Sequence, residues 1–83
     1  MTAAAQPERT VSAPRVDWAQ LIVDLVLAGY SHERIAAECM RGKTWVWTLA
    51  NEPGSEPRFH DGQILLGLWA RATGRPEGEV PVL

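Results

Sequence analysis

The chain has 83 residues, of which 46% are hydrophobic and 22% charged, a composition typical of one small globular domain and not of a disordered chain. A chain of this length buries roughly 60% of its unfolded surface, so its core must be small. The formal net charge of −2 is unusual for a nucleic-acid-binding protein. From Arg41 to Arg75, however, five cations stand against three anions, so this segment is weakly basic.

The single cysteine, Cys39, excludes an internal disulfide and a cysteine-based metal cluster, and we expect it to be a small buried side chain. No apolar run approaches the ~18 residues that a membrane span needs, and the N-terminal segment lacks the apolar stretch of a signal peptide. A cytoplasmic protein is therefore expected.

The first predicted helix follows a segment over 1–15 that is small, polar and interrupted by two prolines, which we interpret as a flexible arm. Asp17 is a good N-cap, and Gln20 three residues later completes the pattern of a capping box, in which each side chain bonds the other residue's backbone N–H. Gly29 is expected just after the C-terminal end of this helix. Apolar residues repeat at helical spacing between these ends, at Trp18, Leu21, Ile22, Leu25 and Val26.

Two short helices are predicted next, on either side of a break at 40–42. Ser31 caps the first of them. Gly42 provides a flexible entry to the second, which covers about 43–51 and ends before Pro53. The residues expected to face the core are Ile35, Ala36, Cys39, Val46, Leu49 and Ala50.

The last predicted helix starts at His60 or Asp61 and stops at Gly74. Its apolar stripe consists of Ile64, Leu65, Leu68 and Trp69. The segment that follows holds two prolines and shows no periodicity, so it should be extended. The chain is thus divided into a flexible arm over 1–15, a four-helix all-α domain over 16–74 and an extended tail over 75–83.

The break between the two short helices is too short for an antiparallel hairpin, so these helices must cross steeply, as in a helix-turn-helix. The cap, the close approach and the anchoring positions of such a unit are occupied by Ser31, Ile35, Ala36, Cys39, Val46 and Leu49, and "EPRF" precedes a leucine-rich closing helix. With these features the sequence, over about 18–74, resembles the lambda-repressor/Cro-type helix-turn-helix proteins, especially small phage and prophage regulators. That family usually has glycine where this chain has Met40 and an apolar residue where it has Arg41. We expect Gly42 to accommodate the tight turn in a shifted form.

The resemblance implies a lambda-repressor-like domain that binds double-stranded operator DNA, with the helix over about 43–51 in the major groove. It implies a sequence-specific transcriptional regulator, of the phage or prophage repressor type. Because so small a domain contacts only a short half-site, a homodimer on a near-palindromic operator is expected. Leu66, Trp69 and the "VPVL" end are candidate dimer surfaces.

The candidate DNA-binding residues lie on that helix or beside it, and they are Arg41, Lys43, Thr44, Trp45, Trp47, Thr48, Asn51 and Arg58. The helix itself holds no arginine, so the common contact to guanine would have to come from Arg41 or Lys43. Thr44 and Thr48 could bond a phosphate, meet a thymine methyl group or be merely solvated. Arg58 could contact a backbone phosphate, as family members do at the start of this last helix, or be idle.

Trp45 and Trp47 lie ~100° on either side of Val46, and we expect one of them to be half-buried. An exposed tryptophan on this helix either touches thymine methyls and sugars or anchors a protein interface. The alternative function is therefore a helix-turn-helix scaffold reused as a protein-binding module, an inhibitor or adaptor of a host or phage protein. The net acidity, the missing arginine and the paired tryptophans favour this alternative, whereas the resemblance and the Arg41/Lys43 cluster favour DNA.

Catalytic chemistry is not indicated by the sequence. The carboxylates are scattered at helix caps and on exposed faces, and His32 has no partner for metal or triad chemistry. We therefore expect neither an enzyme nor a cofactor nor a bound metal.

Overall fold

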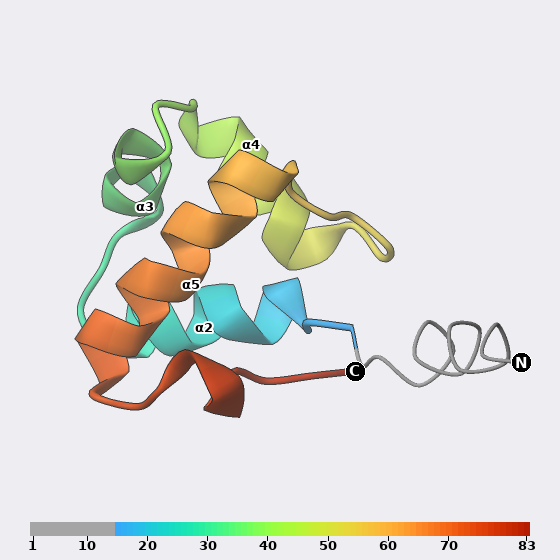
Figure 1. Cartoon of the computed structure of the whole chain (residues 1–83). Helices are drawn as coiled ribbons and strands as arrows, with labels where there is room; N and C mark the ends of the chain where they lie inside the picture. The colour runs from blue at the N-terminus through green and yellow to red at the C-terminus, as the bar shows by residue number, and fades with distance from the viewer. Residues whose placement is uncertain (1–14) are drawn as a thin grey trace, which may run out of the picture.

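The computed structural model describes residues 15–83, and it is an all-α fold as predicted. Four α-helices and one 3-10 helix follow in chain order (Figure 1), namely α2 (Trp18–Leu27), α3 (His32–Glu38), α4 (Lys43–Asn51), α5 (Phe59–Thr73) and η2 (Glu77–Glu79). The arm predicted over 1–15 lies outside the described residues except for Arg15.

The ends of the helices follow the predicted capping residues in three places. The Ser31 hydroxyl accepts a hydrogen bond from the backbone N–H of Arg34 at 3.1 Å and so caps α3. Gly29 and Gly74 follow α2 and α5 with φ angles of 105° and 72°. These are left-handed conformations that glycine adopts without a steric penalty, and they end the two helices.

The capping box predicted for α2 is only half formed. The Asp17 carboxylate accepts from the backbone N–H of Gln20 at 3.1 Å, as expected. The Gln20 side chain does not return the bond, because its amide donates instead to Asp24 at 2.9 Å. The backbone N–H of Asp17 is satisfied by the carbonyl of Pro81 at 2.9 Å, so a distant segment replaces the local partner.

Helix α5 begins at Phe59, slightly earlier than the predicted start at His60 or Asp61. Its N-cap residue, Arg58, makes no side-chain capping bond, so no capping side chain marks this boundary in the sequence. Asp61 lies in the first turn with a buried side chain. Its carboxylate accepts hydrogen bonds from Arg41 rather than capping the helix.

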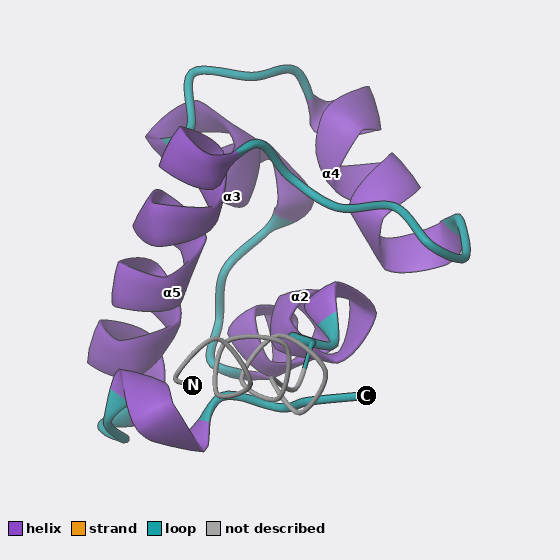
Figure 2. Cartoon of the chain, turned by 45° about the vertical axis from the view of Figure 1, so that its right-hand side comes forward, coloured by secondary structure: helices purple, strands orange, loops and turns teal. Residues whose placement is uncertain are grey.

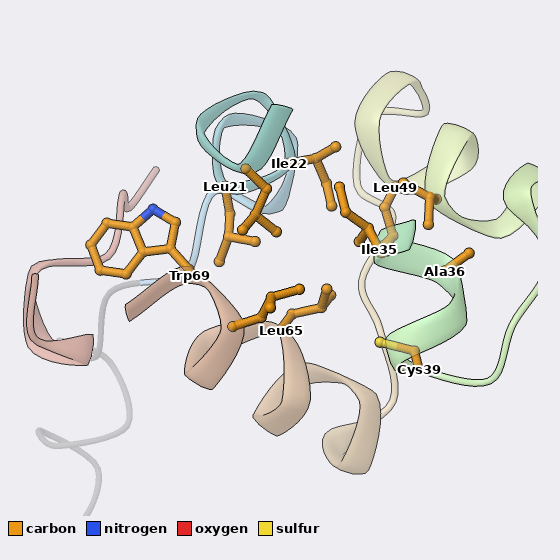
Figure 3. Close-up of a cluster of buried hydrophobic side chains, with 11 residues drawn as sticks. Leu21, Ile22, Ile35, Ala36, Cys39, Leu49, Leu65 and Trp69 are labelled. Atoms are coloured by element: carbon orange, nitrogen blue, oxygen red, sulfur yellow. The ribbon is translucent and has the colours of Figure 1, made fainter. Parts of the chain in front are cut away.

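One apolar core joins the four helices (Figure 3), and α4 packs against both α2 and α3 while α5 packs against α2. Most of the predicted core positions are confirmed by the buried residues, which are Leu21, Ile22, Leu25, Ile35, Ala36, Cys39, Val46, Leu49, Leu65, Leu68 and Trp69. Trp18, Ala50 and Ile64 are only partly buried. The assignment of Val26 to the core is wrong, since its side chain is exposed. It lies ~90° around α2 from the centre of the stripe formed by Leu21, Ile22 and Leu25.

The segment after α5 differs from the extended tail predicted over 75–83. It contains η2 and then runs back beside the chain that enters α2, where Val82 forms an isolated antiparallel bridge with Val16. The backbone N–H of Leu83 donates to the carbonyl of Arg15 at 2.8 Å. The C-terminal end therefore lies next to the start of the described chain (Figure 1), and Val80 packs against the core. Residues 75–83 thus fold back along the helices.

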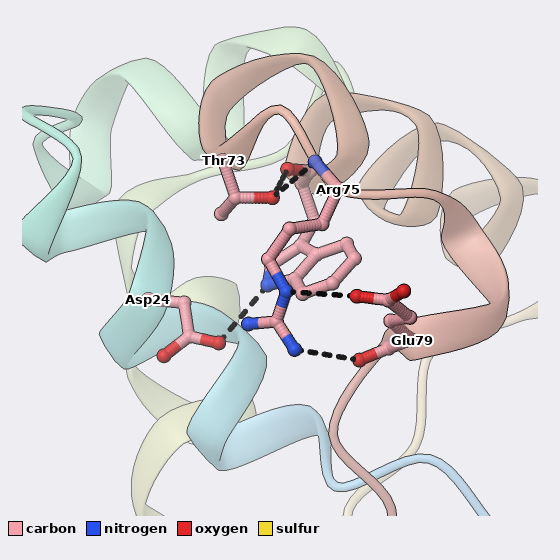
Figure 4. A network of polar contacts seen from close by, with 5 residues as sticks. Asp24, Thr73, Arg75 and Glu79 are labelled. Carbon is pink, nitrogen blue, oxygen red and sulfur yellow. Dashed lines mark hydrogen bonds and ion pairs between the residues drawn. The ribbon is translucent and has the colours of Figure 1, made fainter.

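A small polar network fixes this segment over the buried Trp69 (Figure 4). The indole N–H of Trp69 donates to Asp24 on α2 at 3.0 Å. The guanidinium of Arg75 lies 5.1 Å from the centroid of the Trp69 ring and donates to the carboxylate of Glu79 at 3.3 Å. The tryptophan is thus enclosed by α2 on one side and by the returning segment on the other.

Candidate nucleic-acid interface

The turn between α3 and α4 is built around Met40. Met40 has a φ of 56°, which makes it the one residue other than glycine among residues 15–83 with a positive φ. The next residue, Arg41, donates its backbone N–H to the carbonyl of Ala36 at 2.9 Å. Gly42, the N-cap of α4, has an ordinary φ of −85°. The expected shift of the tight turn to Gly42 is therefore wrong, because Met40 itself adopts the left-handed conformation.

Arg41, a predicted DNA contact, forms an ion pair with a buried carboxylate of the protein. Its guanidinium donates to one carboxylate oxygen of Asp61 at 2.7 Å and 3.2 Å, and it lies 5.6 Å from the centroid of the Trp45 ring. The Asp61 side chain is 5% exposed and that of Arg41 is 36% exposed. This pair joins the turn before α4 to the first turn of α5. It also neutralises the positive charge of Arg41, which the sequence alone would assign to a DNA contact.

Cys39 lies beneath the same turn and is buried, as predicted. Its sulfur is 4.0 Å from the backbone carbonyl oxygen of Asp61. Burial, followed by the negative charges of Asp61 and Glu38, raises the pKa of the Cys39 thiol to about 11. The thiol therefore stays protonated at neutral pH, and its chemistry is that of a small apolar side chain.

Helix α4 presents one buried and one exposed face. Val46 and Leu49 are buried against the neighbouring helices. Trp45 is half-buried, whereas Trp47 is 51% exposed. The asymmetry follows from helical geometry, because Leu49 shifts the centre of the buried stripe to ~70° from Trp45 and ~130° from Trp47. The prediction that one of the two tryptophans is half-buried is confirmed.

Two of the polar residues on the outer side of α4 are bonded within the helix. The Thr48 hydroxyl donates to the carbonyl of Thr44 at 3.0 Å, and the Asn51 amide donates to the carbonyl of Trp47 at 2.9 Å. Thr44 and Asn51 are exposed and Thr48 is half-buried. A base or phosphate that engages Thr48 or Asn51 must compete with these intrahelical bonds or share them.

Two of the predicted DNA contacts are exposed cations. Lys43, in the first turn of α4, is exposed and is 3.9 Å from the equally exposed carboxylate of Glu33. Water screens such a pair, so it does not hold the lysine strongly. Arg58 is exposed at the N-terminus of α5.

The structure thus divides the predicted DNA-binding residues into three groups. Those that share the outer side of α4 are Lys43, Thr44, Trp47, Thr48 and Asn51. Trp45 lies at the margin of the core, and Arg41 is held against Asp61. Arg58 is on a different helix, and Figure 2 shows α4 at the edge of the domain.

Sequence reasoning missed two features near these residues. The first is Asp61 as the partner of Arg41, which is 20 positions away, so no local pattern could reveal it. The second is an open groove of about 440 Å³ between the start of α2 and α5, whose lining includes Trp18, Pro57 and Phe59. The one sequence feature that points to this groove is Phe59, which follows "EPR" and has an exposed side chain.

The predicted dimer surface is corrected at one position. Trp69 is 0% exposed and cannot contact a second chain without unfolding of its surroundings. Leu66 is partly buried against the core, and Val82 pairs with Val16, although Val82 and Leu83 remain exposed.

Within residues 15–83, no group of three or more histidine, cysteine, aspartate or glutamate side chains could hold a metal ion. None of the helices in this part of the chain is long and apolar enough to cross a membrane.

Comparisons of the chain with protein-family models, with curated proteins and with solved structures found no match. A function must therefore be argued from the arrangement of α4, its turn and the residues around them.

Proposed function

We propose that the protein is a sequence-specific DNA-binding transcriptional regulator of the phage or prophage repressor type, in which α3 and α4 form a helix-turn-helix and α4 enters the major groove. The observation that supports this proposal is that α4 is buried along one side and exposed along the other. Val46 and Leu49 attach one side of the helix to the domain, and Thr44, Trp47 and Asn51 leave the opposite side exposed. A short helix fixed at the edge of a domain with a free outer face is what groove insertion requires.

The conformation of the turn also supports the proposal. Met40 is left-handed at the position where the lambda-repressor/Cro-type family usually has glycine. A left-handed residue costs roughly 1–2 kcal/mol when it is not glycine. Two contacts of Arg41 stabilise the turn despite this cost. Its backbone N–H bonds Ala36 on α3, and its side chain forms the ion pair with Asp61 on α5.

The electrostatics favour phosphate contacts from Lys43 and Arg58. Both are exposed, and neither is tied to a buried acid as Arg41 is. Each lysine or arginine that meets a phosphate releases counterions, which makes binding depend on salt. With a net charge of −2, attraction to DNA must come from such local cations and not from the charge of the whole chain.

A salt series on a bound duplex tests the proposal. Duplexes are selected from a library with a randomised centre, and the affinity for the selected duplex is measured over 50–300 mM salt by fluorescence anisotropy. We expect Lys43→Ala and Arg58→Ala each to flatten the slope of log K against log salt by about one unit. Arg71→Ala is the matched control, because Arg71 is an exposed cation in the last turn of α5, and it should leave the slope unchanged. Binding to no duplex at low salt, by a chain that circular dichroism shows to be folded, would contradict the proposal.

A protein-binding module is the second candidate function, and one observation favours it. Trp47 is half-exposed midway along α4, at one margin of its outer face, and buried tryptophans concentrate binding energy in protein interfaces. In that case selected duplexes would not emerge from the library. Binding to a protein partner would be lost in Trp47→Ala and would respond weakly to salt.

A further inference from the structure

The outer face of α4 is poor in groups that read guanine. Thr44, Trp47, Thr48 and Asn51 lie within ~100° of one another around the helix axis, opposite the buried stripe. The helix contains no arginine, and its one lysine, Lys43, lies at the first position. The commonest specific contact to guanine, from an arginine or lysine to its two acceptor atoms, is therefore missing from the centre of this face.

Two of the polar side chains of this face, Thr48 and Asn51, donate hydrogen bonds within the helix. The hydroxyl hydrogen of Thr48 is directed to the carbonyl of Thr44, and the amide of Asn51 to the carbonyl of Trp47. A contact to adenine by asparagine uses both its amide and its carbonyl groups, so Asn51 would first have to give up its bond to the helix.

The groups left to meet a base are largely apolar. Trp47, midway along α4 and at one margin of this face, exposes half of its large side chain, and Thr44 is exposed one turn before it. Each base pair presents donors and acceptors in the major groove, but only one base presents an apolar group there, the C5-methyl group of thymine. The apolar surface of an exposed indole is complementary to that methyl group.

We infer that Trp47 makes α4 a reader of thymine methyl groups, so the preferred duplex carries A·T pairs beneath the centre of the helix. This inference rests on the proposed function, because it assigns a specificity to the same helix face. Lys43 and Arg58 then supply the attraction to the backbone, and Trp47 supplies the preference among sequences.

Replacement of thymine by deoxyuridine tests this inference directly, because it removes the methyl group and leaves every hydrogen bond of the pair intact. The probe is the duplex selected from the randomised library, with each thymine replaced in turn. We expect the affinity to fall about fourfold at one or two positions, as for the loss of one buried methyl group. Replacement at the remaining thymines should have no effect.

Variants assign the effect to a side chain. Trp47→Ala and Trp47→Gln should bind the thymine and deoxyuridine duplexes equally, because the group that meets the methyl is gone. Phe59→Ala is the matched control, since Phe59 is also an exposed aromatic residue but lies on α5, and it should keep the difference between the two duplexes. Circular dichroism confirms that each variant is folded.

The outcomes separate this inference from the proposed function. A deoxyuridine penalty that disappears in both Trp47 variants supports the inference. Salt-dependent, sequence-specific binding without any deoxyuridine penalty, or with a penalty that persists in the Trp47 variants, overturns the inference and leaves the proposed function standing. Failure to bind any duplex overturns both.

Discussion

The guanidinium of Arg41 and the carboxylate of Asp61 form an ion pair that joins the turn before α4 to the first turn of α5. Helix α4 has its own contacts with α2 and α3, and this pair adds a link to α5. The pair holds the turn that precedes α4, and through this turn it restricts movement of the N-terminal end of α4.

Removal of the two partners should have unequal effects on stability. Arg41→Ala leaves the Asp61 carboxylate buried without its cation, whereas in Asp61→Asn the partly exposed Arg41 can turn to water. Breaking a buried pair costs about 3–5 kcal/mol, and partial exposure reduces this, so we expect a loss of about 2 kcal/mol for Arg41→Ala and about 1 kcal/mol for Asp61→Asn. Urea unfolding measures both losses. Arg15→Ala, which breaks the exposed pair with Glu56, is the control and should cost at most about 0.5 kcal/mol. A larger loss of stability for Asp61→Asn than for Arg41→Ala would show that Asp61 is not the more deeply buried partner of the pair.

Met40→Gly should stabilise the protein. The left-handed conformation of Met40 is costly for any side chain, and the Met40 side chain is 92% exposed, so little packing is lost. Glycine loses more entropy on folding, which offsets part of the gain, and we expect a net increase of about 0.5–1 kcal/mol in the free energy of unfolding. Thermal and urea unfolding give the value.

Two glycines provide the controls for this substitution. Gly74 has a φ of 72°, so Gly74→Ala should destabilise the protein by about 1 kcal/mol. Gly42 has a φ of −85° and open space around the position of an added methyl group, but it is the N-cap of α4, where alanine is less favourable than glycine, so Gly42→Ala should be neutral or cost up to about 1 kcal/mol without any backbone strain. A destabilised Met40→Gly variant would contradict the assigned backbone conformation.

Stability should fall at alkaline pH because of Cys39. Burial raises the pKa of this thiol from 9.0 to about 11, so between these values the unfolded chain loses the proton while the folded chain keeps it. The folded state then binds more protons than the unfolded state, and the free energy of unfolding decreases as the pH rises from about 9 to about 11. The slope cannot exceed about 1.4 kcal/mol per pH unit for one group.

Comparison with Cys39→Ala isolates this contribution. The difference in stability between wild type and Cys39→Ala should be constant below pH 8 and should shrink above pH 9. In the native state the thiol should also react slowly with a disulfide reagent and rapidly after unfolding. Fast labelling of the folded chain at pH 8 would show that the thiol is accessible.

Asp24→Ala should cost about 1–3 kcal/mol, because it leaves the buried indole N–H of Trp69 without its acceptor. The same substitution should cost less in a Trp69→Phe background, where that donor is absent. A double-mutant cycle followed by urea unfolding measures the difference. Equal costs in both backgrounds would assign the effect of Asp24 to its bond with Gln20 instead.

Local patterns predicted the helices well. Ser31, Gly29 and Gly74 mark helix ends through bonds and backbone angles that involve only their own neighbours, so the sequence around them is sufficient. Ile35, Val46 and Leu49 are buried because their helical spacing places them on one side.

The errors arise where a distant partner decides the local structure. Asp17 resembles one half of a capping box, yet Pro81 takes the place of the local partner. Arg41 resembles a free cation beside a DNA-binding helix, yet Asp61 binds it from α5. Long-range pairs of this kind leave no periodic signal.

The bridge between Val16 and Val82 also has a consequence for the order of folding during synthesis. The segment that satisfies the backbone N–H of Asp17, at the start of α2, is made only after all four helices have left the ribosome's catalytic centre. The entry to the first helix is therefore among the last parts of the domain to be closed. A released chain that lacks residues 80–83 should hold its helices with a loose N-terminal edge, which Pro81 and Val82 complete in the full domain.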